Sequence, residues 1–289
     1  MSEKPIVLTV YLSKGGVAKS TLAALIAEYL AARGDTVVLM DLDRQGSQSE
    51  IFDLVGEDGR TDEVLHQVLT RRLDVLAALT EIPTERIPEL DGEEKGALYV
   101  LQGGPQTSEA IDAIVANPVR FKIANTLGMV RQPIRDLGGF ADYVVMDMEP
   151  SDQMAALAGL VATDALVVPT TSDFLSVARI ATVMDEVEVA RQVQPVAVLG
   201  IVQVMTRYYF GRLRKSKTVQ VGEEFLRVNY NDLLLRDTKG NTVDIPYDEA
   251  WRNVMWAGQS VLATETKARN DALRFLEAVM HNLPEVING

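Results

Sequence analysis

A short glycine-rich segment with two lysines carries the clearest chemistry in this chain. It reads Ser13-Lys14-Gly15-Gly16-Val17-Ala18-Lys19-Ser20-Thr21. Glycines let backbone N–H groups close around a phosphate, a lysine then binds the β- and γ-phosphates, and a hydroxyl binds Mg²⁺. The segment therefore predicts a nucleotide phosphate-binding loop, in which Lys19 contacts the phosphates and Ser20 the metal ion. A second lysine at the front, Lys14, is the mark of a subclass of such loops.

The sequences on both sides of this loop support the prediction. Residues 5–12 are apolar and rich in β-branched side chains, as in a strand that is buried on both faces. After the loop, apolar residues recur at helical spacing from Leu22 to Leu30, and Arg33-Gly34 ends the helix. A helix that begins at the loop directs its free N–H groups and its positive dipole end at the phosphates. The alternative is a glycine turn in a protein that binds no nucleotide.

Three acids lie at the ends of predicted strands. Asp41 and Asp43 follow one apolar run, and Asp147 follows another. Open parallel sheets bind ligands at the carboxyl ends of their strands, and Asp147 has the position of a Walker B acid that helps to hold Mg²⁺. We predict that Asp41 and Asp147 join Ser20 around Mg²⁺, and that Asp43 orients the water that attacks the γ-phosphate. The alternatives are a helix cap for Asp147 and solvated loop positions for all three acids.

Strand and helix signals alternate along the chain. This order predicts an α/β fold in which helices cover both faces of a mostly parallel, twisted sheet. Because no repeat or linker divides the sequence, residues 1–289 are expected to form a single domain. An acidic segment at about 53–97 is expected to be a mainly helical insertion. The expected strands are 5–12, 36–40, 98–101, 143–146, 165–168 and 196–205, and the expected later helices are 176–192 and 263–283.

Composition limits the classes of function. The 289 residues include no cysteine, which excludes disulfides, thiolate catalysis and cysteine-ligated iron–sulfur clusters. There is no signal-peptide pattern and no apolar run of about 18 residues, so we expect a cytoplasmic protein. The net charge is −13, but residues 53–95 hold twelve acids and only five bases. By contrast, residues 189–222 contain no acid and several bases, so a basic face on this acidic protein is possible.

Three motifs in order resemble the deviant Walker ATPases of the ParA/MinD group. The family patterns K-G-G-V-G-K-T-T, D-x-D-P-Q-G and D-x-P-P-S are similar to Lys14–Thr21, Asp41–Gly46 and Asp147 with Pro150-Ser151. Residues 164–169 and Ile245-Pro246 are further matches. The resemblance therefore runs from about Ile6 to the final helix and leaves the acidic segment unmatched. It implies the P-loop NTPase fold of the deviant Walker A class.

The resemblance also implies an ATP-dependent homodimer that hydrolyses ATP slowly, as a timer. Lys14 would cross the interface to the partner's ATP, whereas Lys19 would serve its own subunit. A partner protein similar to ParB would accelerate hydrolysis. The nucleotide contacts that it implies are Lys14, Gly15, Gly16, Val17, Ala18, Lys19, Ser20, Thr21, Thr206 and Pro246.

The choice of partner depends on the remaining residues. ParA-like members bind DNA without sequence preference and associate with the nucleoid, which assigns DNA contacts to Arg212, Arg214, Lys215 and Lys217. The alternative for these residues is a solvated basic loop, and Arg207 is left open between nucleotide and DNA. Membrane binding is not expected, because the chain ends without the basic amphipathic helix of MinD-like members.

Three positions depart from the family pattern. Ala18 replaces a glycine, which is strained only if its φ is positive, and Arg44 and Glu149 replace prolines. These changes affect hydrolysis more than nucleotide binding. The leading interpretation is thus a partition or positioning ATPase with ATP and Mg²⁺ as cofactors. The alternative is a P-loop enzyme that uses ATP on a small metabolite, with the acidic segment as a lid or a partner-docking surface.

Overall fold

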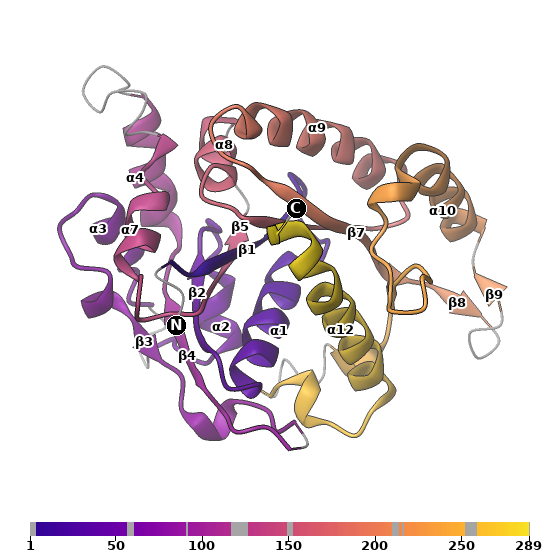
Figure 1. Cartoon of the computed structure of the whole chain (residues 1–289), viewed down its shortest axis with the longest axis horizontal. Coiled ribbons are helices and arrows are strands. Elements are labelled where there is room, and N and C mark those ends of the chain that lie inside the picture. Colours follow the sequence, from indigo (N-terminus) through magenta and orange to yellow (C-terminus); the bar gives the residue numbers. More distant parts are fainter. Residues whose placement is uncertain are drawn as a thin grey trace.

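The structure, a computed structural model, describes residues 4–56, 61–90, 92–116, 127–148, 153–209, 214–215, 217–251 and 259–288. Eight strands in these residues form one sheet (Figure 1). They are β1 (Ile6–Tyr11), β2 (Thr36–Asp41), β3 (Thr80–Glu81), β4 (Ala97–Leu101), β5 (Tyr143–Met148), β6 (Ala165–Thr170), β7 (Ala197–Thr206) and β10 (Asp244–Pro246). The order is β10-β7-β6-β1-β5-β2-β4-β3, and each described pair is parallel except β3 with β4. The expected mostly parallel sheet is confirmed.

Helices cover both faces of this sheet, as the sequence predicts. Figure 1 shows α1 and α12 side by side on one face, with α8 and α9 in a layer on the other. The two layers arise because right-handed crossovers that run in opposite directions across a sheet place their helices on opposite faces. The helices are α1 (Lys19–Ala32), α2 (Ser47–Ile51), α3 (Leu65–Leu69), α4 (Pro105–Ala116), α7 (Arg131–Asp136), α8 (Gln153–Leu160), α9 (Phe174–Arg191), α10 (Lys217–Tyr230) and α12 (Lys267–Asn288).

The centre of the sheet is where the crossover direction changes. The chain leaves β1 through α1 toward β2, on one side, and it leaves β6 through α9 toward β7, on the other. The loops that follow β1 and β6 therefore diverge at the carboxyl ends of two neighbouring strands. Open α/β sheets bind their ligands at such a point. The glycine-rich loop with two lysines occupies it, because it connects β1 to α1.

Two of the predicted site acids lie within strands and not after them. β2 extends to Asp41 and β5 extends to Met148, and Asp41 pairs with Asp147 in the parallel ladder. The β5 ladder continues on the other side, where Asp147 pairs with Val10 of β1. Pairing on both sides extends β5 past its apolar run. Both carboxyl groups are consequently fixed by the sheet and fully buried.

The acidic segment at about 53–97 is less helical than the sequence suggests. In its described residues, regular helix is limited to α3 and two short 3-10 turns at Leu76–Ala78 and Thr84–Arg86. The segment also adds β3 to the edge of the sheet, antiparallel to β4. The prediction of a mainly helical insertion is therefore wrong. Packing against the sheet, through buried Ile82 and Ile87, outweighs the local helix preference.

One buried acid joins α1 to the segment before α12. Glu28 is 7% exposed, and its Oε2 accepts a hydrogen bond from Ser260 Oγ at 2.6 Å. Burial raises the pKa of Glu28 to about 7, although the Ser260 hydroxyl and the charge of Arg86 oppose the rise. Because the folded state holds this proton more tightly than the unfolded chain, folding loses stability as pH rises from about 4.5 to about 7.

Glu28→Gln is expected to remove that loss, which amounts to about 3 kcal/mol when the pKa difference is converted at 1.36 kcal/mol per unit. A glutamine Oε1 can still accept from Ser260 but carries no charge. Urea unfolding at pH 5 and pH 8.5 should show the variant gaining stability over the original chain only at the higher pH. The exposed acid Glu50, changed to glutamine, is the control. An equal pH dependence in both proteins would contradict the assignment to Glu28.

Candidate nucleotide-binding site

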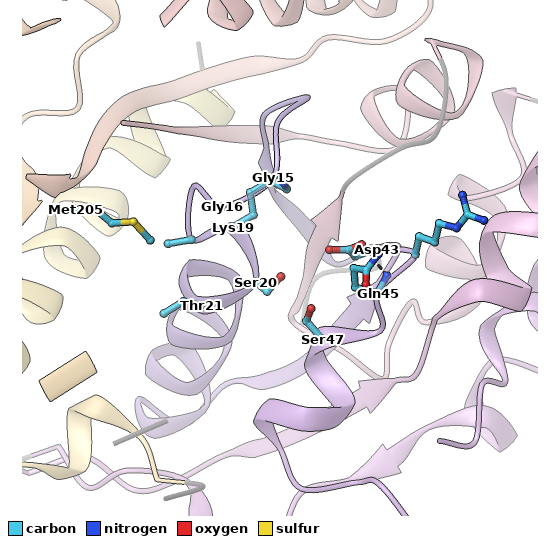
Figure 2. Close-up of a pocket in the computed structure, with 11 residues that line it drawn as sticks. Gly15, Gly16, Lys19, Ser20, Thr21, Asp43, Gln45, Ser47 and Met205 are labelled. Carbon is cyan, nitrogen blue, oxygen red and sulfur yellow. Dashed lines mark hydrogen bonds between the residues drawn. The ribbon is translucent and has the colours of Figure 1, made fainter. Parts of the chain in front are cut away.

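A pocket of about 710 Å³ lies at the carboxyl ends of the central strands. Its volume falls within the range of about 300–1,000 Å³ that is usual for small-molecule sites. Figure 2 shows the start of α1 in the middle of the pocket, with Asp43, Gln45 and Ser47 on one side and Met205 on the other. The lining residues are Gly15, Gly16, Ala18, Lys19, Ser20, Thr21, Asp43, Arg44, Gln45, Ser47 and Met205. Most of the predicted nucleotide contacts thus meet in one cavity.

The loop between β1 and α1 has the geometry of an anion site. α1 begins at Lys19, so the N–H groups of its first turn, which have no carbonyl partner within the helix, begin at the pocket. Lys19 is 4% exposed, and its Nζ donates to the carbonyl of Lys14 at 2.7 Å. This contact bends the lysine side chain back over its own loop. Val17, also predicted to contact nucleotide, is buried and does not line the pocket.

Ala18 is strained in this loop. Its φ is 57° and its ψ is 27°, which is the left-handed helical region, as is the φ of 73° at Gly16. The sequence left two possibilities for Ala18, and the structure selects the unfavourable one. Alanine in this region costs about 1–2 kcal/mol because Cβ approaches the following carbonyl oxygen. The chain therefore accepts strain at the residue directly before Lys19.

Ala18→Gly is expected to stabilise the protein by about 1 kcal/mol. The relief of about 1–2 kcal/mol is offset in part by the greater freedom of glycine in the unfolded chain, about 0.4–1 kcal/mol. Urea unfolding of the original chain and the variant measures the difference. Ala24→Gly, within α1, is the control and should destabilise by about 1 kcal/mol or more. A loss of stability at Ala18 similar to that at Ala24 would contradict the strain assignment.

Lys14, the other lysine of the loop, is held away from the pocket. Its Nζ donates to both carboxylate oxygens of Asp173 at 2.8 and 2.9 Å and to Ser176 Oγ at 2.6 Å. Asp173 is the N-cap of α9 and accepts from the backbone N–H of Ser176. Partial burial raises the pKa of Asp173, but hydrogen bonds from Lys14, Thr171 and Ser176 outweigh it and hold the pKa well below its usual range. In this arrangement Lys14 does not line its own subunit's pocket.

The paired acids Asp41 and Asp147 form the negative part of the site. Burial raises the pKa of Asp41, and the neighbouring charge of Asp147 adds to this effect. Burial also raises the pKa of Asp147 to about 6, although the nearby Ser20 hydroxyl and the hydrogen bond from Gln48 oppose the rise. Two buried carboxyl groups that resist ionising together favour a cation beside them.

The donor set fits magnesium with phosphate oxygens as additional ligands. Asp147 Oδ1 is buried and has no hydrogen-bond partner among the described residues, so it is available to a cation. Both oxygens of Asp41 already accept backbone N–H groups, from Asp43 and Gln48, each at 3.0 Å. No group of three or more His, Cys, Asp or Glu able to hold a metal occurs in the described part of the chain. Mg²⁺ is usually held by one or two carboxylates and by phosphates, which agrees with this sparse set.

Asp43 and Arg44, which follow β2, both line the pocket. Asp43 is 4% exposed, and its Oδ1 accepts from the backbone N–H of Gln45 at 2.8 Å. Asp43 therefore has a fixed orientation in the wall of the cavity, as a water-orienting group requires. Arg44 is exposed and also lines the pocket, so it adds a positive charge where the family pattern has proline.

The predicted nucleoside contacts are paired but do not line this pocket. Thr206 of β7 is opposite Pro246 of β10, and Thr206 Oγ1 donates to the carbonyl of Ile245 at 3.2 Å. The neighbouring Met205 reaches the cavity instead, with a positive φ of 54°. Successive residues of a strand face opposite sides of the sheet. Moving the predicted contact by one position along the strand therefore replaces Thr206 with Met205. Arg207 stacks on Tyr247, with 5.7 Å between the guanidinium carbon and the ring centre.

Of the basic residues predicted to contact DNA, Arg214, Lys215 and Lys217 lie in or directly after a small ribbon beyond β7. Its strands are β8 (Tyr208–Tyr209) and β9 (Arg214–Lys215), paired antiparallel. Lys217 is exposed at the start of α10, whereas Arg212 lies outside the described residues, as do Glu149 and the Pro150-Ser151 match. In the part of the chain that is described, no helix combines the length and apolar character needed to cross a bilayer.

Two residues that contribute to the site were not singled out from the sequence. The sequence predicts Met205 only as the last residue of the strand at 196–205. Gln48 carried no signal, since it lies outside the matched motifs and its contacts to Ser20 and Asp147 join residues far apart in the chain. The contact between Lys14 and Asp173 could not be predicted from the sequence either. A pattern search finds local motifs, whereas these contacts depend on the fold.

Comparison with known proteins gives relatives by both sequence and structure. Residues 6–198 match the model of a family described as AAA domain. The chain is 28% identical to the chromosome partitioning protein ParA of Caulobacter vibrioides over 241 residues, which cover 80% of this chain and 79% of ParA. It is 29% identical to the cell division protein PomZ of Myxococcus xanthus over 163 residues, 56% of this chain but only 45% of PomZ. The chain thus spans less than half of PomZ.

A solved structure of Cyanothece McdA in complex with ATP has a similar fold. The TM-score is 0.78, the sequence identity is 15%, and the match covers 98% of both chains. At this identity, the likeness concerns the fold alone. The arrangement of strands and helices around the pocket is therefore shared with a protein whose solved complex contains ATP.

Proposed function

This chain belongs to the AAA domain family, within the ParA/MinD type of P-loop ATPases, and we propose that it is an ATP-dependent dimerising ATPase for DNA partition or cargo positioning. In this proposal the dimer forms with ATP, binds DNA of any sequence and is released by hydrolysis. An activating partner protein similar to ParB accelerates that hydrolysis. Relatives named for chromosome partitioning and cell division support this function.

The observation that carries the proposal is the separation of the two loop lysines. Lys19 lines the pocket of its own chain, whereas Lys14, five residues earlier, points away to Asp173. A lysine so close to a phosphate site, yet outside it, is positioned to serve a second pocket that faces the first. ATP would then lie between two chains and hold them together. This arrangement supports an ATP-dependent dimer.

The residues of the pocket also support hydrolysis. The first turn of α1 and Lys19 would bind the phosphates, and Asp43 would orient the attacking water. Ser20 and Asp147 would hold Mg²⁺, which supplies neutralising charge for the phosphates when it is bound. Asp41 would act mainly by fixing the backbone N–H groups of Asp43 and Gln48. Hydrolysis would remove the γ-phosphate contacts between the two chains and so allow them to separate.

DNA binding is the part of the proposal that rests on charge. Lys217 follows the β8–β9 ribbon, where Arg214 and Lys215 add two more bases, and this ribbon comes after the carboxyl end of β7, whose Met205 lines the pocket. Basic side chains that contact phosphates bind duplex DNA without reading its sequence. A ribbon beyond the end of β7 would be brought close to the ribbon of a second chain when two pockets face each other.

The experiment that tests the function is binding to duplex DNA of arbitrary sequence, with ATP, with ADP and without nucleotide, at 50 and 200 mM salt, roughly the range in which phosphate contacts weaken. Light scattering in the same samples gives the oligomeric state. Dimers and DNA binding should occur only with ATP, and binding should weaken at the higher salt. Dimers that do not bind DNA would point to a protein or metabolite partner. ATP hydrolysis by a chain that does not dimerise would overturn the proposal.

A charge variant tests the assigned surface. Lys217→Ala should weaken DNA binding uniformly and reduce the slope of log affinity against log salt by about 1. Lys239→Ala is the matched control, because Lys239 is also exposed but lies in the turn before β10. Equal effects of the two variants on DNA binding would show that the basic ribbon is not the DNA-binding surface.

A further inference from the structure

A buried carboxamide lies beside the acids of the nucleotide pocket. Gln48, on α2, is 0% exposed. Its side-chain Nε2 donates to Asp147 Oδ2 at 2.8 Å and to the carbonyl of Ser20 at 3.0 Å, and its backbone N–H donates to Asp41 Oδ2 at 3.0 Å. One residue therefore links α1, β2 and β5 at the point where the predicted metal ligands meet.

The contact with Asp147 selects which oxygen of that carboxylate is available. Oδ2 is occupied by the amide of Gln48, whereas Oδ1 is buried without a hydrogen-bond partner in the described residues. A carboxylate with no such contact could rotate and exchange its two oxygens. Hydrogen bonds to a charged acceptor are among the stronger ones in proteins, so the amide holds the carboxylate in one orientation.

The amide of Gln48 has one further polar atom. Its Oε1 is buried and, like Asp147 Oδ1, has no partner among the described residues. Buried polar atoms are nearly always hydrogen-bonded, so two unpartnered oxygens on adjacent side chains point to a group that the described residues do not supply. Both are acceptors, which matches a cation together with the water molecules that it carries.

We infer that Gln48 is a positioning residue for the magnesium site, acting through Asp147. This inference rests on the proposed function, since it assumes that the pocket binds nucleotide with Mg²⁺. Gln48 orients Asp147 so that Oδ1 faces the cation, and its Oε1 accepts from water in the cation's shell. The carbonyl of Ser20 anchors the same amide, which couples the Ser20 hydroxyl and the Asp147 carboxylate as one unit.

The test measures how nucleotide binding depends on Mg²⁺. A fluorescent, non-hydrolysable ATP analogue is titrated into the full chain in EDTA and at increasing Mg²⁺. Loss of a partner that orients a metal ligand typically lowers metal affinity by about 10- to 100-fold, and Gln48→Ala is expected to lower the apparent Mg²⁺ affinity by this amount. Binding of the analogue in EDTA should stay unchanged, because Gln48 does not line the pocket and its amide reaches the loop only at the carbonyl of Ser20.

Gln102→Ala provides a matched control. Gln102 is 3% exposed, and its amide accepts from Ser49 Oγ at 3.1 Å and donates to Thr80 Oγ1 at 3.0 Å, away from Asp147. Its removal should disturb packing to a similar extent without changing the apparent Mg²⁺ affinity. If Gln48→Ala does not fold, Gln48→Met fills the site without the N–H donor and takes its place.

Each outcome decides the inference. Unchanged Mg²⁺ dependence in a folded Gln48 variant would overturn it, as would an equal loss in Gln102→Ala or a loss of binding in EDTA. If the nucleotide affinity of the original chain does not depend on Mg²⁺, both this inference and the magnesium part of the proposed function are overturned. An original chain that binds Mg²⁺ and nucleotide but never dimerises would contradict the proposed function alone.

Discussion

Replacing Lys14 with alanine is expected to abolish ATP-dependent dimerisation while ATP binding to the single chain persists. Lys14 does not line its own pocket, so its loss removes no contact to the nucleotide of the same subunit. Truncating one partner of a buried charged pair across an interface costs about 2–5 kcal/mol, which corresponds to a weakening of about 30-fold or more. Light scattering with ATP gives the dimer fraction, and a fluorescent ATP analogue gives the affinity of the single chain.

Lys4→Ala is the control for this variant. Lys4 also forms an ion pair with an aspartate, Asp164, at 2.8 Å, but it lies before β1 and away from the pocket. It should leave both dimerisation and ATP binding unchanged. If the Lys14 variant dimerised at the same ATP concentration as the original chain, Lys14 would have no role in the dimer interface.

The ion pair between Lys14 and Asp173 makes a further expectation possible. If Lys14 must leave Asp173 to reach a second chain, Asp173→Asn should favour the dimer, by up to about fivefold, since a partly exposed ion pair contributes at most about 1 kcal/mol. Asparagine is also a good N-cap, so the start of α9 should be preserved. A dimer that is weaker in this variant would indicate that Asp173 serves the interface directly.

Replacing Asp43 with asparagine is expected to have the opposite effect to the Lys14 variant. The ATP dimer should form and persist, but hydrolysis should fall by at least about 100-fold, the lower end of what a positioned acid–base group contributes. The reason is that Asp43 is held in the pocket wall with Oδ1 accepting from Gln45, and an asparagine offers one acceptor oxygen where the carboxylate offers two. Phosphate release in a single turnover measures hydrolysis, and light scattering measures the dimer.

Asp142→Asn is the matched control. Asp142 Oδ2 accepts from the backbone N–H of Thr36 at 2.9 Å, much as Asp43 Oδ1 accepts from Gln45 at 2.8 Å. Asp142 precedes β5 and therefore lies at the opposite end of the strands from the pocket. Its variant should hydrolyse ATP at the original rate. Normal turnover in the Asp43 variant would exclude the water-orienting role.

The architecture and the position of the pocket followed from local patterns. Apolar strand runs alternate with helical periodicity, and the glycine-rich loop lies between the first strand and the first helix. These features act over a few residues, because strand pairing and helix formation respond to which faces of a segment are apolar. They were enough to place Lys19, Ser20 and Asp43 in one cavity.

The acidic segment shows where such reasoning fails. Its residues have helical preferences, but the edge strand β3 and the burial of Ile82 and Ile87 place it against the sheet. Intrinsic preferences are small, below about 1 kcal/mol per residue, so burial of apolar side chains overrides them. The sign of φ at Ala18 was undecided for a related reason, since the loop that sets it is closed by both β1 and α1.

What this chain encodes locally is thus the loop, its lysines and hydroxyl, and the strands that end in acids. Those features require only neighbours in the sequence. The fold alone decides that Lys14 reaches Asp173, 159 positions away, that Asp41 lies beside Asp147, and that Gln48 orients the Asp147 carboxylate from 99 positions away. Contacts of this kind form only when distant segments pack, because the free energy that holds them comes from burial and from hydrogen bonds inside the assembled core.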